Sequence, residues 1–311
     1  MDMTLKWYQK VCLESLWACL FLLSHTPRFF RYHMLKPFIA SILILVGYRK
    51  KVITRNLGKS FPEKNHAEIK TLRRRNYQFL AEVIVDTISL VGASEERKQK
   101  AVNWINAQEI RENTDGKDWI AMGGHYGCWE YLPLWSMMQP SNTFMSVYHP
   151  LKSTVFEHFY QRIRKVSENI VQIPMRNAIP HYLRNRNKGM ILGLLSDQSP
   201  QLREDTHWFK FMNQDTAFID GAENIALKYK LPIYFAHTTK IAPGRYEVRL
   251  NQLYDGKEPV APHEITGRYA RMLESMIKEC PELWMWSHNR WKHTPEKQTR
   301  LFGKSTLTDT D

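Results

Sequence analysis

In this 311-residue chain, the residue types best suited to chemistry lie together in Gly123-Gly124-His125-Tyr126-Gly127-Cys128-Trp129-Glu130. An imidazole that is oriented by a carboxylate can take a proton from a hydroxyl, so His125 is the candidate general base. Glu130 is the candidate group that hydrogen-bonds the other ring nitrogen. Gly123 and Gly124 leave main-chain N–H groups that can stabilise developing negative charge. A histidine and a glutamate at this spacing also occur by chance, as a capping histidine near an unrelated glutamate.

The elements around this motif decide whether His125 reaches a ligand. The apolar run 119–122 enters the motif, and a helix-compatible segment, 129–138, leaves it. Pro133 is tolerated in that segment because it falls near the helix start. If the run is a buried strand, His125 lies at the strand's carboxyl end, which is where open α/β sheets bind their ligands.

Short apolar runs alternate with helical stretches along most of the chain. We expect strands at 143–147, 170–173, 189–195, 233–240 and 246–250. We expect helices at 66–91, within 94–113, and at 153–165, 177–186, 221–229 and 265–279. This order predicts an α/β fold with a mainly parallel sheet flanked by helices. The residues from about Thr294 onward are expected to form a loose polar tail.

The net charge favours anionic partners. The chain has 44 Lys+Arg against 31 Asp+Glu, a formal net charge of +13. Phospholipid headgroups, phosphorylated glycolipids and an acidic carrier protein are the candidates. Nucleic acid is not expected, since the sequence has no zinc-ligand spacing, no RNP-like aromatic motif and no dense basic helix. Ten tryptophans among the basic residues suit a membrane interface better.

The amino-terminal residues hold two apolar runs, 11–23 and 37–48, each shorter than the ~20 residues that a spanning helix needs. We interpret residues 1–50 as a membrane-associated helical hairpin at the interface, and residues 51–311 as the catalytic domain. The basic residues that would meet anionic headgroups are Arg28, Arg31, Lys36, Arg49, Lys50 and Lys51. A span that recruits residues from Leu5 onward, or two ordinary core helices, are the alternatives. Glu14 and the lack of an A-x-A site argue against a cleaved signal peptide.

The cysteines predict a reducing compartment. Cys12, Cys19, Cys128 and Cys280 form no CxxC pair and no framework of disulfides. The chain is therefore expected to face the cytoplasm.

Several segments occur in an order typical of one enzyme family. They are Arg55-Asn56-Leu57 with Ser60-Phe61-Pro62-Glu63, Gly124-His125-Tyr126-Gly127-Cys128-Trp129-Glu130, Tyr148-His149-Pro150, Ser196-Asp197-Gln198-Ser199-Pro200, residues 209–221, and Trp284-Met285-Trp286-Ser287-His288-Asn289-Arg290-Trp291-Lys292. From Arg49 to Lys292 the chain resembles the late acyltransferases of lipid A biosynthesis, the lauroyl/myristoyl transferases of Gram-negative inner membranes. These belong to the wider glycerolipid-type H-x4-D/E acyltransferases. His149 stands where the family often has an arginine, so a role for an arginine there does not carry over.

The resemblance implies an enzyme that moves a fatty acyl group from an acyl carrier protein thioester to a hydroxyl of a phosphorylated, Kdo-bearing lipid A precursor. His125 would be the base, Glu130 would orient it, and main-chain N–H groups or an arginine would offset the oxyanion charge. Both substrates can be held together, so no acyl-enzyme is needed and Cys128 is not the expected nucleophile. No metal or redox cofactor is implied. The implied location is the cytoplasmic face of the bacterial inner membrane.

The resemblance also implies four substrate contacts: Arg164, Asp197, Gln198 and Arg290. Each has a structural alternative. Asp197 and Gln198 can cap the end of a strand, and Arg290 can belong to a tryptophan-rich core segment. Arg164 can lie on a solvated basic helix face.

Other functions stay open at the level of sequence. The same chemistry can serve another acceptor, such as a lysophospholipid or an aminolipid, or use acyl-CoA as the donor. A membrane-associated binding protein that keeps the fold without catalysis is a different class. The intact His125 and Glu130 argue against it, because a lipid-binding module does not require them.

Overall fold

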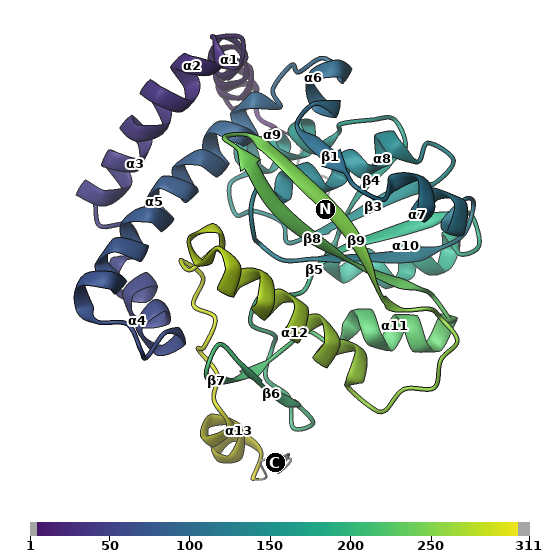
Figure 1. Cartoon of the computed structure of the whole chain (residues 1–311). Helices are drawn as coiled ribbons and strands as arrows, with labels where there is room; N and C mark the ends of the chain where they lie inside the picture. The colour runs from purple at the N-terminus through teal and green to yellow at the C-terminus, as the bar shows by residue number, and fades with distance from the viewer. Residues whose placement is uncertain (1–4, 304–311) are drawn as a thin grey trace.

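The strand that enters the candidate motif, β2 (Trp119–Gly123), is buried on both faces. Ile120 and Met122 belong to one apolar cluster, and Trp119 and Ala121 to another, as the two-residue period of a strand requires. Such a strand needs a layer of helices on each side. The computed structural model, which describes residues 5–303, has this arrangement (Figure 1).

β2 lies at the centre of a seven-stranded sheet with the strand order β1-β9-β8-β2-β5-β3-β4. Neighbouring strands are parallel except β8 and β9, which form an antiparallel hairpin. The other strands of the sheet are β1 (Val102–Trp104), β3 (Thr143–Tyr148), β4 (Ile170–Pro174), β5 (Met190–Leu195), β8 (Ile233–Ala242) and β9 (Arg245–Tyr254). A separate antiparallel pair consists of β6 (Trp208–Phe211) and β7 (Gln214–Ala217). The predicted α/β fold with a mainly parallel sheet is confirmed.

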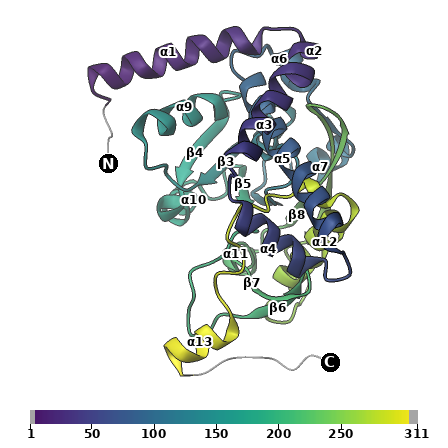
Figure 2. The same ribbon diagram turned by 90° about the vertical axis from the view of Figure 1, so that its left-hand side faces the viewer.

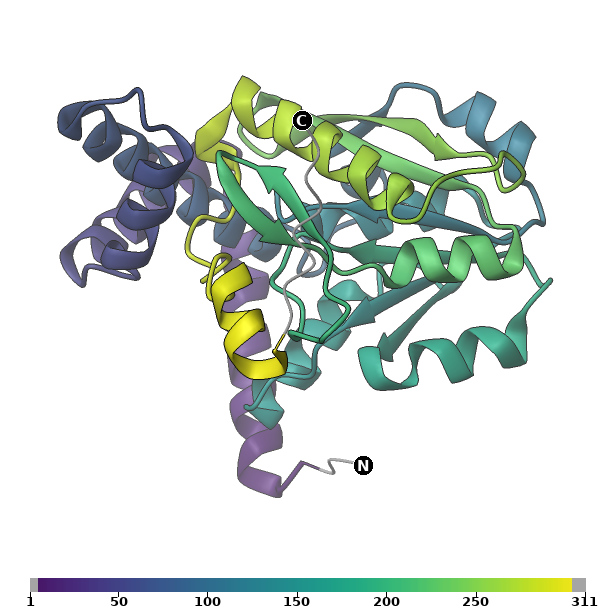
Figure 3. The ribbon, with the colours of Figure 1, turned by 90° about the horizontal axis from the view of Figure 1, so that it is seen from below.

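Helices cover both faces of the sheet. One face carries α10 (Ala178–Asn185), α11 (Gly221–Tyr229) and α12 (Glu264–Glu279). Figure 3, which views the molecule from below, shows α11 and α12 in front of the strands. The other face carries α7 (Ala107–Thr114), α8 (Trp135–Met138) and α9 (Thr154–Arg164).

The chain contains further helices and helical turns. They are α1 (Trp7–Ser24), α2 (Arg28–Phe30), the π-helical turn η1 (Arg31–Leu35), α3 (Lys36–Leu45), α4 (Lys50–Ser60), α5 (His66–Ser89), α6 (Glu95–Gln99), the 3₁₀ turns η2 (Trp129–Leu134), η3 (Met175–Asn177) and η4 (Pro281–Leu283), and α13 (Pro295–Phe302). α4 and α5 contribute buried side chains to the same apolar cluster as α12, so they belong to the main body.

Most of the expected strands and helices are present within a residue or two, and the differences have local causes. The segment expected as one helix after Glu130 is instead the 3₁₀ turn η2 followed by α8, because Pro133 lacks the N–H that a longer α-helix needs. Residues 295–302, expected in a loose tail, form α13, which Thr294 caps. α13 is held to β6 because Trp208 Nε1 donates to Gln298 Oε1 at 2.6 Å. The last part of the expected tail, 304–311, lies outside the described residues.

The amino-terminal segment exposes many apolar side chains. They are Trp7, Tyr8, Val11, Phe21, Leu22, Phe29, Phe30, Met34, Phe38, Ile42, Ile44, Leu45, Val46 and Tyr48. Figure 2 shows α1 running across the top while α2 and α3 turn away from it, so the two runs do not pack side by side as a hairpin. Within residues 5–303, no one helix meets the length and apolarity that a bilayer span requires. Only Arg28–Leu45 taken with Lys50–Ser60, a pair bent by 93°, meets them.

A buried ionic cluster on α5 ties this segment to the sheet. The carboxyl group of Asp86 accepts hydrogen bonds from Tyr32 Oη at 2.6 Å and Tyr246 Oη at 2.9 Å. One turn earlier on α5, Glu82 forms ion pairs with Lys36 and Lys240. Tyr32 and Lys36 come from η1 and α3, and Tyr246 and Lys240 from the β8–β9 hairpin. The expected boundary at residue 50 is therefore crossed by buried polar contacts.

Candidate active site

Two neighbouring strands bring the candidate histidine to a carboxylate from another part of the chain. β2 and β5 are parallel, and Gly123 lies opposite Leu195 at their carboxyl ends. His125 and Asp197 each follow two residues later, so the loops after the two strands place these side chains next to each other. This edge of an open α/β sheet is where ligands bind.

Asp197 holds His125 with both carboxylate oxygens. Nδ1 of the ring lies 2.6 Å from Oδ1, and the main-chain N–H of His125 donates to Oδ2 at 2.8 Å. An ionised carboxylate can only accept hydrogen bonds, so the ring proton is on Nδ1 and the lone pair is on Nε2. Gln198 Nε2 donates to His125 Nε2 at 3.2 Å. The side of the ring that can accept a proton is therefore the side that Gln198 contacts.

The environment of Asp197 keeps it ionised. Its side chain is 3% exposed, and Trp284 Nε1 donates to Oδ2 at 2.8 Å. Burial alone would raise the pKa of Asp197, but the electrostatic interaction with His125 and the hydrogen bonds from His125 and Trp284 outweigh burial and lower the pKa to about 2. With both oxygens occupied by protein donors, Asp197 positions His125 instead of making the substrate contact expected from the sequence.

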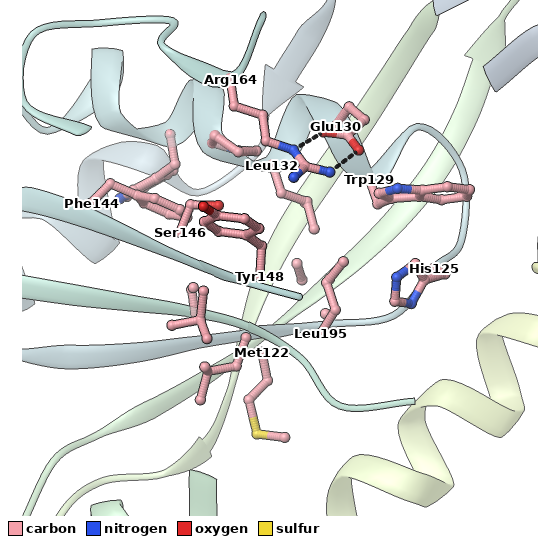
Figure 4. A pocket seen from close by; sticks show the side chains of 18 of the residues that line it. Met122, His125, Trp129, Glu130, Leu132, Phe144, Ser146, Tyr148, Arg164 and Leu195 are labelled. Carbon is pink, nitrogen blue, oxygen red and sulfur yellow. Dashed lines mark hydrogen bonds and ion pairs between the residues drawn. The ribbon is translucent and has the colours of Figure 1, made fainter. Parts of the chain in front are cut away.

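Glu130 has a different partner from the one expected. Its two oxygens accept hydrogen bonds from Arg164, from Nε at 2.7 Å and from Nη2 at 2.6 Å (Figure 4). The planar guanidinium fits a carboxylate in this two-bond geometry. Burial alone would lower the pKa of Arg164, but the hydrogen bonds and charge of Glu130 raise it. The prediction that Glu130 orients His125 is corrected, because Asp197 takes that position and Arg164 takes the carboxylate of Glu130.

Arg164 ends α9 and reaches the site from the sheet face opposite α12. Its guanidinium also lies 5.1 Å from the ring centre of Tyr160. The predicted contact of Arg164 with a substrate phosphate or carrier stays a prediction. The structure brings Arg164 to the same cavity wall as Glu130, not to a solvated helix face.

The carboxyl-terminal tryptophan segment fixes the loop that carries His125. Trp284 forms a single antiparallel bridge with Tyr126, and the N–H of Met285 donates to the carbonyl of His125 at 3.0 Å. The N–H of Gly127 donates to the carbonyl of Leu283 at 3.0 Å. The indole of Trp284 then reaches Asp197, so one segment holds both members of the histidine–carboxylate pair.

Two buried asparagines, which the sequence analysis did not single out as site residues, hold that tryptophan segment in place. Asn56 Nδ2 donates to the carbonyls of Trp286 and His288, each at 2.9 Å. Asn76 Nδ2 donates to the carbonyls of Glu282 and Trp284. The signal for Asn56 is its place in the Arg55-Asn56-Leu57 element, because an asparagine on a buried helix face needs hydrogen-bond partners. These contacts explain why elements far apart in the chain belong to one site.

The two glycines before His125 make close approaches. Tyr269 Oη donates to the carbonyl of Gly123 at 2.8 Å. A Cβ on Gly124 would lie 2.8 Å from the end of the Leu273 side chain and 3.5 Å from Asp197, so a larger residue here would have to displace Leu273. A role for their own N–H groups in binding an oxyanion stays a prediction.

Arg290 lies in the core behind the site. It is 3% exposed, its Nη2 donates to the carbonyl of Ala217 at 2.5 Å, and its guanidinium lies 4.6 Å from the ring centre of Phe218. Burial lowers the pKa of Arg290 to about 10, against the opposing charge of Asp197. The expected substrate contact of Arg290 is replaced by a structural one, as the tryptophan-rich core alternative describes.

Cys128, which lies inside the motif, is buried and faces the second apolar cluster. Burial raises the pKa of its thiol well above the usual value, so the reactive thiolate is disfavoured. Its place in the structure therefore agrees with the expectation that it is not the nucleophile.

A cavity of about 340 Å³ opens beside His125 and extends along β2. Its polar lining includes His125, Gln198, Glu130 and Arg164. Beyond these groups the wall is mostly apolar. It includes Leu194 and, as Figure 4 shows, Leu132, Phe144 and Leu195.

Three tryptophans line the far end of the cavity. Trp135 makes edge contacts with Trp104 and Trp119, with ring centres 5.0 and 6.0 Å apart. Both Trp119 and Gly123, the first and last residues of β2, line the cavity, so it follows the strand for about 13 Å. An apolar pocket of this size with a few polar groups at one end is typical of a small-molecule or lipid site.

Within residues 5–303, no group of three or more His, Cys, Asp or Glu residues is placed to hold a metal ion.

Comparison with known proteins agrees with the geometry of the site. A search of curated proteins found no match. Residues 9–293 match the family described as bacterial lipid A biosynthesis acyltransferase. The match covers most of the chain and includes every element of the site, so the chain belongs to the family of bacterial lipid A biosynthesis acyltransferases.

Proposed function

We propose that this acyltransferase moves a fatty acyl group from an acyl carrier protein thioester to a hydroxyl of a lipid A precursor, with His125 as the general base. The observation that carries the proposal is the His125–Asp197 pair at the polar end of a long apolar cavity. A base next to an acyl-sized cavity is what transfer to a hydroxyl requires.

The proposed reaction transfers the acyl group from sulfur to oxygen while His125 carries the proton in the opposite direction. Nε2 of His125 takes the proton of the acceptor hydroxyl, and the oxygen attacks the thioester carbonyl to form a tetrahedral intermediate. The intermediate collapses to an ester as the C–S bond breaks, and the imidazolium returns the proton to the leaving thiolate. Asp197 stabilises the imidazolium, and the hydroxyl takes the place that a serine occupies in a Ser-His-Asp triad.

Arg164 is the proposed electrostatic partner of this reaction. A cation beside the cavity can offset the negative charge that develops on the thioester oxygen. Glu130 binds two donors of the guanidinium and so limits the directions in which Arg164 can point. Glu130 then acts through Arg164. Gln198 donates to Nε2 of His125, and because that nitrogen has one lone pair, this hydrogen bond breaks when the acceptor hydroxyl binds there.

The donor and the membrane are proposed from charge and exposure. An acidic carrier protein suits a chain with a net charge of +13. The exposed apolar side chains of α1, α2 and α3 suit an interfacial position at the cytoplasmic face of the bacterial inner membrane. A lipid acceptor in that membrane would meet the site without leaving the bilayer surface.

Mass spectrometry of reaction products tests the proposal. Purified protein is offered a tetra-acylated lipid A precursor together with acyl carrier protein thioesters. The expected result is a mass gain of one acyl group that His125→Ala removes. Parallel reactions with acyl-CoA, a lysophospholipid and an aminolipid identify another donor or acceptor. Near-native turnover by His125→Ala would contradict the mechanism.

A further inference from the structure

A second pocket, of about 270 Å³, lies between the amino-terminal helices, α6 and the tip of the β8–β9 hairpin. Its lining is strongly basic and includes Arg28, Arg31, Arg97, Lys98, Lys100 and Arg245. Tyr131 also lines this pocket, and the neighbouring Glu130 lines the catalytic cavity. The pocket is therefore distinct from the site of acyl transfer, although the two share one turn of chain.

The positive charge in this pocket is not balanced by carboxylates. Glu96 is the acidic residue in the lining, and it pairs with Lys100. Among the residues that the structure describes, Arg28, Arg31, Arg97, Lys98 and Arg245 form no ion pair. Burial lowers the pKa of Arg31, and the charge of the neighbouring Arg97 lowers it further.

Main-chain carbonyls satisfy part of this cluster. Arg31 donates to the carbonyls of Ser24 and Thr26, and Arg97 Nη2 donates to the carbonyl of Ser24 at 2.7 Å. These bonds cap the carboxyl end of α1. They do not use the Nε–H of Arg31, which is buried without a hydrogen-bond partner in a residue that is only 8% exposed. A buried, unpaired guanidinium N–H beside a cationic pocket is costly unless an anion fills the pocket.

We propose that this pocket binds a phosphate group. A phosphate has several strong acceptor oxygens and one or two negative charges, which match converging guanidinium groups.

The position of the pocket indicates a lipid headgroup as one source of the phosphate. Phe29 and Phe30 follow Arg28 directly on α2, and both are exposed. If these side chains enter a membrane, Arg28 and the pocket mouth lie at the level of the lipid phosphates. The assignment to a lipid headgroup rests on the proposed membrane association, whereas binding of free phosphate does not.

The test measures binding of inorganic phosphate to the purified full-length protein by calorimetry at constant ionic strength. Arg97→Gln is expected to weaken binding by about tenfold, because a hydrogen bond to a charged group is lost. Arg245 is exposed and its side chain has no hydrogen bond to any residue within 5–303. Arg245→Gln is therefore expected to weaken phosphate binding by about threefold without disturbing the fold. Arg249→Gln is the matched control, since Arg249 is exposed four residues further along β9 and lies outside the pocket.

His125→Ala separates this inference from the proposed function. Phosphate binding is expected to survive His125→Ala, even if the acyl-transfer assay gives no product. Vesicles of phosphatidylcholine with and without phosphatidic acid then identify the source. Binding that needs phosphatidic acid, and that Arg245→Gln weakens and free phosphate displaces, assigns a lipid headgroup. Phosphate binding without a preference for phosphatidic acid assigns free phosphate. No saturable phosphate binding, or an equal loss in Arg249→Gln, overturns the inference.

Discussion

At the scale of single residues, the site depends on which carboxylate holds His125. Asp197→Asn keeps the size of the side chain but places an N–H₂ or a weaker acceptor against Nδ1. The proton can then move to Nε2, and the base is lost. We expect kcat to fall by about 10³- to 10⁴-fold with little change in KM. Steady-state kinetics measures this.

Gln198→Ala serves as the comparison, because it removes only the donor to Nε2. We expect the kcat of Gln198→Ala to fall by about tenfold or less. Because the pKa of Asp197 is about 2, the carboxylate stays ionised throughout the physiological pH range. If the kcat of Asp197→Asn stayed within about tenfold of the wild-type value, another group would have to orient the ring of His125.

Glu130 and Arg164 are expected to act as one unit. Arg164→Gln should lower kcat/KM by about 10²- to 10³-fold, the size of effect seen when one oxyanion-stabilising donor is removed. Glu130→Gln should have a similar effect, because Arg164 then loses its orientation. The double variant should be no worse than either single one. Additive losses would mean that Glu130 has a catalytic role apart from Arg164. Unfolding curves are needed as well, since breaking a buried ion pair costs about 3–5 kcal/mol.

At the scale of elements, the tryptophans at the far end of the cavity are expected to set the acyl-chain length. Trp104 comes from the edge strand β1 and lines the cavity. Replacing its side chain with alanine is therefore expected to extend the cavity and to leave β2 unchanged. Trp104→Ala is expected to raise the kcat/KM ratio of longer over shorter acyl thioesters by at least about tenfold. The reason is that one methylene in an apolar pocket is worth about 1–3 kcal/mol. Trp208→Ala, outside this cavity, should leave the ratio unchanged. Competition between thioesters of two lengths measures it.

The individual strands and helices were largely predictable from the sequence, whereas their arrangement in space was not. Residues 119–122 and 189–195 are read as buried strands from their apolar runs, and His125 and Asp197 follow them at equal distance. The strand order, which makes β2 and β5 neighbours, depends on tertiary packing and has no local signal. Without the strand order, Glu130 was the carboxylate expected to hydrogen-bond His125, because it lies five residues away in the sequence. The β6–β7 hairpin and α13 were missed because their short segments lack a clear apolar period.

At the scale of the whole molecule, Asp86 links the amino-terminal helices to the β8–β9 hairpin and makes stability depend on pH. Burial and the charge of Glu82 raise the pKa of Asp86 to about 7, against the hydrogen bonds of Tyr32 and Tyr246 and the charge of Lys240. In the unfolded chain its pKa returns to the ordinary value of 3.8. The folded state therefore holds a proton that the unfolded state releases, and the stability that Asp86 contributes below pH 4 is lost as the pH rises toward 7.

Asp86→Asn is expected to remove this dependence. The free energy of unfolding, measured by urea denaturation, should fall between pH 4 and pH 7.5 by up to about 4 kcal/mol more in the wild type than in the variant. Comparing the two proteins cancels the titration of all other groups. Tyr32→Phe deletes a hydrogen bond that lowers the pKa of Asp86, so it should move the loss of stability to higher pH. Equal pH dependence in the wild type and Asp86→Asn would show that Asp86 stays ionised in the fold. In that case η1, α5 and the β8–β9 hairpin are held together by a charged, not a protonated, carboxyl group of Asp86.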